Sequence, residues 1–139
     1  GFDVAIKIIP YLVAMLVGIG VFRASGILEG LLYIFESCVS WLGFDVSFVP
    51  ALPTAILRPF SGSGSRAMMI ETMNTYGVDS FPALIAATIQ GSTETTFYVL
   101  ALYFGSVGIK NARHAIGCGL AADFAGITAA ILLGYWFFI

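Results

Sequence analysis

The sequence predicts an all-α integral membrane protein, a helix bundle that contains a re-entrant helical hairpin and a discontinuous transmembrane helix. Apolar residues make up 59% of the 139 residues and charged residues only 10%, whereas soluble domains have about 45–50% and about 25%. The mean hydropathy is +0.97, and a chain this short in water needs more polar surface than such a composition supplies. In addition, two apolar regions are each interrupted by a glycine-containing polar step.

Ionisable residues lie within or beside most apolar segments, which favours a bundle around a polar centre over simple membrane anchors. Even the longest uncharged run, Phe124 to Ile139, is shorter than the ~18 residues of a plain membrane helix. We expect Phe2 to Arg23 to form a first membrane helix. For Gly26 to Gly43 we favour an amphipathic helix at the membrane surface, with a second tilted span as the alternative.

The last predicted span is Ala115 to Ile139, with Asp123 buried in it. Its small residues predict a smooth face for close helix packing. They are Gly117, Gly119, Ala122 and Gly126.

A half-length hairpin is predicted before the middle of the chain. Its arms, Ala51 to Phe60 and Ala67 to Tyr76, are each too short to cross a bilayer at ~1.5 Å per residue. The predicted tip between them is Ser61-Gly62-Ser63-Gly64-Ser65-Arg66. Irregular backbone at membrane depth is tolerated only beside protein or water. We therefore expect this segment to enter the membrane and return on the same side.

A second polar step, Gln90-Gly91-Ser92-Thr93-Glu94-Thr95, interrupts the next apolar region. A half-helix from Phe81 to Gln90 is expected to start at a Ser80 cap, with Pro82 in its first turn. The break is predicted at Gly91-Ser92, and a second helix from Thr93 to Ile109.

The chemistry of these two steps is that of a ligand site. A helix start has N–H groups without internal partners and a partial positive charge, so it favours anions and polar ligands. Hydroxyl, amide and carboxylate groups add donors and acceptors, and ionisable groups within membrane segments often carry function. All twelve residues of the two steps are therefore candidate binding residues. For Glu94 a structural reading stays open: with Gly91 as N-cap it occupies N3, where a carboxylate favours the helix dipole.

Four other positions have more than one interpretation. Arg66 could bind an anion, mark the membrane edge, or pair with Glu71 or Glu94, and we prefer pairing. Glu71 and Asn74 are second-tier candidates because a spacing of three puts them on one helix face; solubilisation at the membrane surface is the alternative. Asp123 is also second-tier, with a structural polar contact as the alternative.

Catalysis and nucleic-acid binding are not expected. The net charge is −2, and the short basic cluster from Lys110 to His114 indicates a cytoplasmic loop rather than a nucleic-acid surface. The sequence contains no P-loop, metal-ligand spacing or supported Ser-His-Asp set. We expect no catalytic residue, metal site or resident cofactor, and sodium or a proton is the candidate coupling cation.

Specific motifs extend over nearly the whole chain. They are Ile9–Leu16, Arg58–Met69, Glu71–Met73, Thr88–Leu100, Tyr103–Lys110 and Arg113–Ala115. These motifs resemble the spore maturation protein B family, of the Gate or nucleoside-recognition superfamily, to which concentrative nucleoside transporters are related. Gly91-Ser92-Thr93-Glu94 is similar to the Gly-Gln-Thr-Glu step that holds the nucleobase in those transporters, with Ser92 in place of the glutamine and Gln90 before the glycine.

The resemblance implies a multi-pass protein of the bacterial inner membrane, linked in spore formers to dehydration of the spore core. It implies one Gate-type domain over residues 1–139, half of an inverted-repeat transporter-like fold, and the start at Gly1 fits the second half of a longer fused polypeptide. Expected partners are the bilayer, a small polar solute, and a second copy or a spore maturation protein A-like subunit. The leading function is binding or transport of that solute, nucleoside-like in character. The alternative is a non-transporting scaffold that assembles with the A-like subunit.

Overall fold

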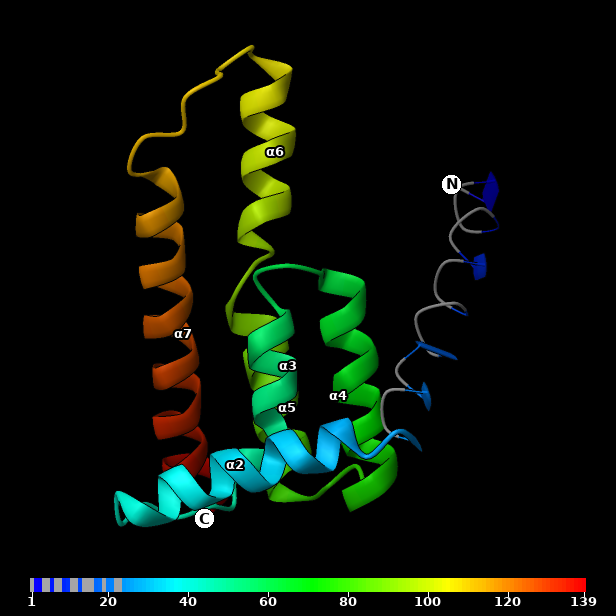
Figure 1. Cartoon of the computed structure of the whole chain (residues 1–139), viewed down its shortest axis with the longest axis vertical. Helices are drawn as coiled ribbons and strands as arrows, with labels where there is room; N and C mark the ends of the chain where they lie inside the picture. The colour runs from blue at the N-terminus through cyan, green and yellow to red at the C-terminus, as the bar shows by residue number, and fades with distance from the viewer. Residues whose placement is uncertain are drawn as a thin grey trace.

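The computed structural model describes residues 24–139 and, before them, positions 2, 3, 6, 9, 10, 13, 17, 18, 20 and 21. The described part contains helices and connections and no strand (Figure 1). In chain order its elements are α2 Ile27–Trp41, the 3-10 turn η1 Val49–Ala51, α3 Leu52–Leu57, α4 Gly62–Tyr76, α5 Phe81–Ser92, α6 Thr96–Ser106 and α7 Ala115–Phe138. The predicted first helix, Phe2 to Arg23, lies mostly outside the described residues.

Helix α7 is long and apolar enough to cross a membrane, and it is the one helix of the described residues that meets both conditions. Its 24 residues extend ~36 Å at ~1.5 Å per residue, more than the ~30 Å of a hydrocarbon core. Only 11% of its most apolar window is buried, unlike the core helix of a soluble protein. Large apolar side chains such as Phe124 and Trp136 are exposed on it. These properties indicate a membrane-embedded helix and agree with the predicted last span.

Helices α5 and α6 follow one another and both pack against α7, and α6 extends beyond the first turn of α7 (Figure 1). The face of α7 that meets them repeats every three or four residues and is formed by Gly119, Asp123, Gly126, Ala130 and Gly134. A Cβ at Gly119 would lie 2.6 Å from Thr96 Cγ2, and one at Gly134 would lie 1.9 Å from Ile85 Cδ1. Close approach therefore requires glycine at these positions. Of the predicted small face, Gly119 and Gly126 make this contact, whereas Gly117 has open space around it.

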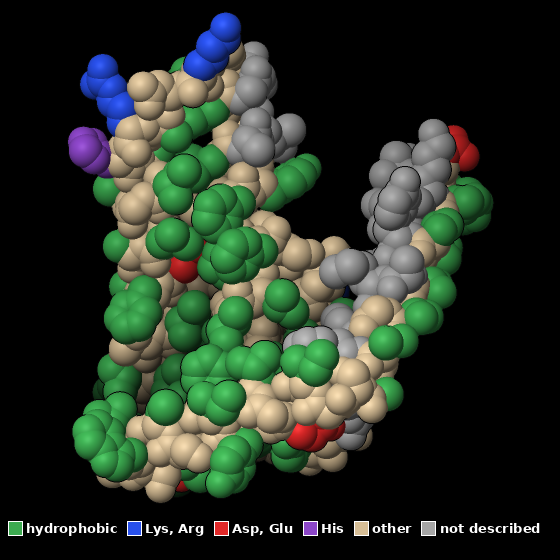
Figure 2. Space-filling view, viewed as in Figure 1, with side chains coloured by type: hydrophobic (Ala, Val, Ile, Leu, Met, Phe, Trp, Pro, Cys, Tyr) green, Lys and Arg blue, Asp and Glu red, His purple; other side chains and the backbone are tan. Residues whose placement is uncertain are grey.

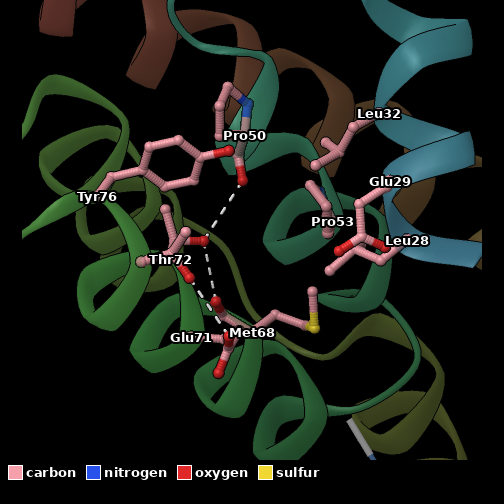
Figure 3. Close-up of a pocket in the computed structure, with 10 residues that line it drawn as sticks. Leu28, Glu29, Leu32, Pro50, Pro53, Met68, Glu71, Thr72 and Tyr76 are labelled. Atoms are coloured by element: carbon pink, nitrogen blue, oxygen red, sulfur yellow. Dashed lines mark hydrogen bonds between the residues drawn. The ribbon is translucent and has the colours of Figure 1, made fainter. Parts of the chain in front are cut away.

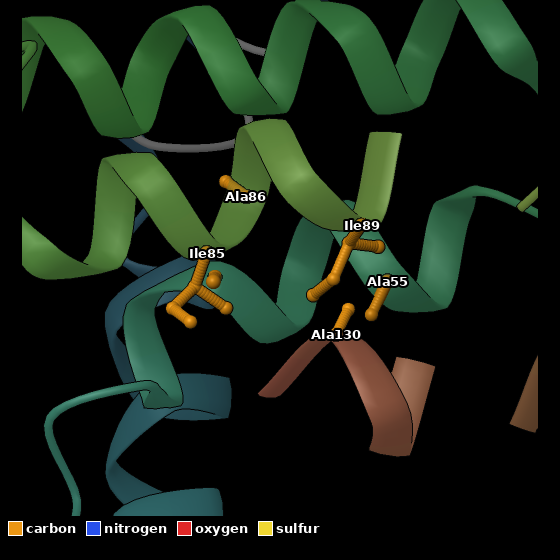
Figure 4. Packing of buried hydrophobic residues seen from close by; sticks show 6 residues of the cluster. Ala55, Ile85, Ala86, Ile89 and Ala130 are labelled. Carbon is orange, nitrogen blue, oxygen red and sulfur yellow. The ribbon is translucent and has the colours of Figure 1, made fainter. Parts of the chain in front are cut away.

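Helix α5 is the centre of the described bundle (Figure 4). Its side chains Ile85, Ala86 and Ile89 are fully buried, and they pack against residues of η1, α3 and α7. The helix starts where it was predicted to start, because the Ser80 hydroxyl accepts the Ala83 N–H at 3.4 Å and Pro82 occupies the first turn. The apolar core therefore holds α5 against three neighbouring elements.

The predicted hairpin is present as α3 and α4, but its tip is shorter than predicted. Helix α4 begins at Gly62, so Ser63 to Arg66 are helical and the turn consists of residues 58–61. The reason is local: Ser61 is the N-cap, and its hydroxyl accepts the Gly64 N–H at 3.0 Å. A serine within the predicted tip thus starts the second helix of the hairpin.

The break in the second interrupted segment lies later than predicted. Helix α5 continues through Gly91-Ser92, and the extended backbone is at residues 93–95. Gly91 is exposed, and a Cβ added to it would meet nothing within 4 Å, so no contact forces a turn there. Thr93 instead ends the helix with φ −122° and ψ 163°, and its hydroxyl donates to the Ile89 carbonyl at 3.1 Å.

Helix α2 runs crosswise to α4 and α7 in Figure 1. Leu28 is buried against Ala67 and Met68 of α4. The crosswise orientation of α2 is the one that a helix at the membrane surface adopts.

In the connection from α2 to η1, the side chain and backbone N–H of Ser47 donate to Asp45, and these bonds lower the pKa of that carboxyl below its ordinary value. The Tyr135 hydroxyl of α7 also donates to Asp45, at 3.0 Å.

Gly134→Val should destabilise the protein by about 1–3 kcal/mol, because overpacking a filled core costs about that much. The Cβ position is 1.9 Å from Ile85 Cδ1, and Ile85 is fully buried. The matched control is Gly117→Val in the same helix, where nothing lies within 4 Å and the change should stay within about 0.5 kcal/mol. Thermal unfolding in detergent measures both, and equal losses would contradict this packing of α7.

Candidate functional site

The tip of the α3–α4 hairpin and the break between α5 and α6 meet in space. The backbone N–H of Phe97, in the first turn of α6, donates to the Pro59 carbonyl at 3.1 Å. The rings of Phe60 and Phe97 are stacked with centroids 5.1 Å apart. At Gly62 a Cβ would lie 2.9 Å from Thr95 Oγ1, so the start of α4 approaches the break closely. The two interrupted segments predicted from the sequence therefore form one junction.

Arg58 connects the two sides of this junction. It follows α3 directly and is buried, 7% exposed. Its Nε donates to the Thr93 carbonyl at 2.9 Å, and its Nη2 donates to the same oxygen. Its Nη2 also lies 3.7 Å from Glu94 Oε1. The carbonyl freed at the end of α5 is thereby satisfied by a cation, which is a stronger hydrogen bond than a neutral donor gives.

Sequence reasoning missed Arg58 as a site residue. It preferred Arg66 as the partner of an acidic side chain, but Arg66 is exposed on α4, and the arginine paired with Glu94 is Arg58. A usable signal was present, because Arg58 lies within the apolar arm Ala51 to Phe60 and ionisable groups in such segments usually face a partner.

A polar pocket of ≈ 360 Å³ opens at the junction. From the hairpin side it is lined by Ser61, Gly62 and Ser63, and from the break by Glu94 and Thr95, with the aromatic rings of Phe60 and Tyr98 at its walls. The Glu94 side chain is 75% exposed, and its Oε1 accepts the Thr95 N–H at 3.0 Å. Since α6 begins at Thr96, Glu94 precedes the helix and does not occupy the N3 position of the structural interpretation.

Two other predicted site residues, Ser65 and Gln90, do not line this pocket. Ser65 is fully buried, and its hydroxyl lies 2.9 Å from the Thr54 carbonyl and 2.7 Å from Gln90 Oε1. One hydroxyl proton serves only one acceptor. If Ser65 donates to Thr54, the Gln90 amide must present its NH₂ to Ser65, an assignment that depends on the hydrogen-bond network. Gln90 and Ser65 therefore join α5 to the hairpin.

The remaining candidates are divided between surface and interior. Gly91 and Ser92 are exposed on the last turn of α5, whereas Gly64 and Thr93 are buried. Neither exposed residue lines the pocket at the junction. The structure thus gathers five of the twelve primary candidates around one pocket: Ser61, Gly62, Ser63, Glu94 and Thr95.

Asp123 contacts the first residue of α6. It is 7% exposed, and the Thr96 hydroxyl donates to its Oδ2 at 2.5 Å. Its partner is thus on another helix, which is a structural polar contact of the kind given as the alternative for this residue. A carboxylate at the start of α6 also interacts favourably with the positive end of the helix dipole.

The second-tier residue Glu71 lines a different cavity, of ≈ 220 Å³, between α2 and α4 (Figure 3). Glu29 faces the same cavity from α2. The hydroxyl of Thr72 on its wall lies 3.0 Å from the Met68 carbonyl and 3.3 Å from the Pro50 carbonyl and can donate to one of them. Asn74 is exposed and does not line it. Within the described part of the chain, no three His, Cys, Asp or Glu side chains come together as a metal site would require.

Residues 5–110 match the model of the Gate family, which is described as nucleoside recognition. The chain is also 44% identical over 133 residues to "Spore maturation protein B" of Bacillus subtilis (strain 168), which covers 96% of this chain and 73% of that protein. The chain therefore belongs to the Gate family and, within it, to the spore maturation protein B family. No solved structure matches the chain.

Arg58→Met should destabilise the protein by about 1.5–3 kcal/mol, the range for hydrogen bonds to charged groups, because the Thr93 carbonyl loses both its donors. Arg66→Met is the matched control, since Arg66 is exposed on the neighbouring helix, and it should change stability by no more than about 0.5 kcal/mol. Thermal unfolding in detergent distinguishes them. An unchanged melting temperature for Arg58→Met would show that its contact to Thr93 contributes nothing to the fold.

Proposed function

We propose that the protein binds a small polar solute in the pocket at the junction and moves it across the membrane. The observation that carries this proposal is the position of the pocket along α7. Thr93 packs against Gly126, which lies at the middle of α7, Ala115–Phe138. If α7 crosses the bilayer, the junction lies near the midplane, where transporters with interrupted helices bind their substrates.

The pocket chemistry supports a ligand with hydrogen-bond donors and a flat face. Glu94 supplies an exposed carboxylate, and Ser61 and Ser63 supply hydroxyls that both donate and accept. Phe60 and Tyr98 are 64% and 62% exposed, and aromatic rings offer a surface for stacking. The ≈ 360 Å³ volume lies within the ~300–1,000 Å³ of small-molecule sites. A nucleoside has these properties, which accords with the family description.

The proposed arrangement in the membrane extends the same argument. The α3–α4 hairpin would be re-entrant, with its tip at the midplane, and α5 with α6 would form a discontinuous crossing beside α7. The protein would be a multi-pass protein of the bacterial inner membrane. A second copy or a spore maturation protein A-like subunit would cover the open side of the pocket, and sodium or a proton would couple movement of the solute.

Nucleoside binding tests this function directly. Titration calorimetry with uridine and adenosine on the purified chain, alone and with an A-like subunit, should give a saturable heat for at least one nucleoside. Glu94→Gln should weaken that affinity about 10- to 100-fold, the equivalent of a hydrogen bond to a charged group. Glu36→Gln, a matched change at an exposed position of α2, should leave it unchanged. An unchanged affinity in Glu94→Gln removes Glu94 from the site, and no saturable heat with either nucleoside rejects the nucleoside class.

A non-transporting scaffold is the second candidate function. It is favoured by the internal satisfaction of the junction, where Arg58 binds Thr93, Ser65 contacts Gln90, and Thr96 binds Asp123. Such contacts hold two segments together without any ligand.

Water access separates the two candidates. With the exposed native residues Cys38 and Cys118 replaced by serine, Ser63→Cys should react with a membrane-impermeant thiol reagent in reconstituted vesicles. Ala86→Cys, at a fully buried position, should not react and serves as the control. Protection of Ser63→Cys to the level of Ala86→Cys would favour the scaffold.

A further inference from the structure

An apolar groove of ≈ 350 Å³ lies between α6 and the start of α7 and shares no lining residue with the polar pocket. Three of its side chains are Phe97, Leu100 and Phe104, whose spacing of three and four puts them on one stripe of α6. The other lining residues are Ile109, Lys110, Ala112 and Ile116. The groove is therefore apolar along its length and has a cation at one end.

That end of the molecule is basic. Lys110, Arg113 and His114 are exposed in the connection between α6 and α7, and Figure 2 shows the Lys, Arg and His side chains of this face gathered there. The sequence has no acidic residue between Glu94 and Asp123, and Asp123 contacts Thr96 at the opposite end of α6. In addition, no side chain caps the start of α7, so its free N–H groups add positive potential to the mouth of the groove.

The length of the groove matches one leaflet of a membrane. It follows α6, whose 11 residues extend ~16 Å, about half of a ~30 Å hydrocarbon core. It runs from the basic connection to Phe97, which is bonded to the hairpin tip and follows Thr96, the residue that packs against Gly119 in the second turn of α7. An amphiphile whose chain spans one leaflet and whose head is anionic fits both the length and the charge.

We infer that this groove binds an anionic phospholipid of the leaflet that faces the basic end. The acyl chain lies against Phe97, Leu100 and Phe104, and the phosphate lies at the mouth beside Lys110 and Arg113. Basic residues at a membrane surface attract anionic lipids, and basic pockets between membrane helices bind their head groups. The groove shares no lining residue with the polar pocket, and the stacked rings of Phe97 and Phe60 lie where the two adjoin.

Native mass spectrometry of the full chain tests the inference. The protein is transferred from micelles that contain phosphatidylglycerol and phosphatidylcholine with identical chains in equal amounts. The wild type should retain phosphatidylglycerol in preference. Lys110→Gln with Arg113→Gln should reduce this preference by about 5-fold for each charge removed. The charge-conserving pair Lys110→Arg with Arg113→Lys is the matched control and should keep it.

Leu100→Trp provides a second test that leaves both charges in place. By filling the groove it should lower retention of phosphatidylglycerol without removing the cations. Equal retention of the two lipids by the wild type would overturn the inference, as would an unchanged preference in the double glutamine variant or unchanged retention in Leu100→Trp. So would equally strong binding of soluble glycerol 3-phosphate, because that result would indicate an anion site without a bound chain.

Discussion

Arg58 is a buried cation, so its guanidinium needs hydrogen-bond and charge partners inside the helix bundle. Its guanidinium donates two hydrogen bonds to the Thr93 carbonyl, and its Nη2 also lies 3.7 Å from Glu94 Oε1. Removing such partners leaves a buried cation, which costs several kcal/mol. The end of α3, the end of α5 and the residues before α6 are therefore fixed together. The Phe97 to Pro59 hydrogen bond then sets the direction in which α6 leaves the junction, and the polar pocket forms between the fixed segments.

The junction depends in turn on how closely α7 approaches it. Gly126 meets Thr93 and Gly119 meets Thr96, with no room for a Cβ at either position. Without water in a bilayer core to drive association, helices there pack through small residues and polar contacts. The same face of α7 carries Asp123, whose bond to Thr96 adds a polar contact to the glycine packing. One helix thus supports both sides of the break and determines its depth.

The end of the molecule at the α6–α7 connection is basic, and the end at α2 is acidic. Basic residues collect at the α6–α7 connection, whereas Glu29, Glu36 and Asp45 lie on or beside α2. Exposed apolar side chains on α7 separate these ends. In a membrane, such a basic connection would favour the cytoplasmic side. This distribution also explains why a polar pocket at the centre and an apolar groove at the basic end suit ligands of different chemistry.

By itself the sequence determined the helical membrane character, the last span, the hairpin, the cap at Ser80 and the existence of two interrupted segments. Composition and capping act over a few residues, so they can be read locally. The positions of the interruptions were decided by tertiary structure. Gly91 stays helical because one glycine costs only about 1 kcal/mol in a helix, and the contacts that hold Thr93 contribute more stabilisation than that. Tertiary structure also decided that Arg58, rather than Arg66, pairs with Glu94. It brought Ser65 and Gln90 into contact with each other and left Glu94 lining the pocket. These outcomes depend on partners that are distant in the chain.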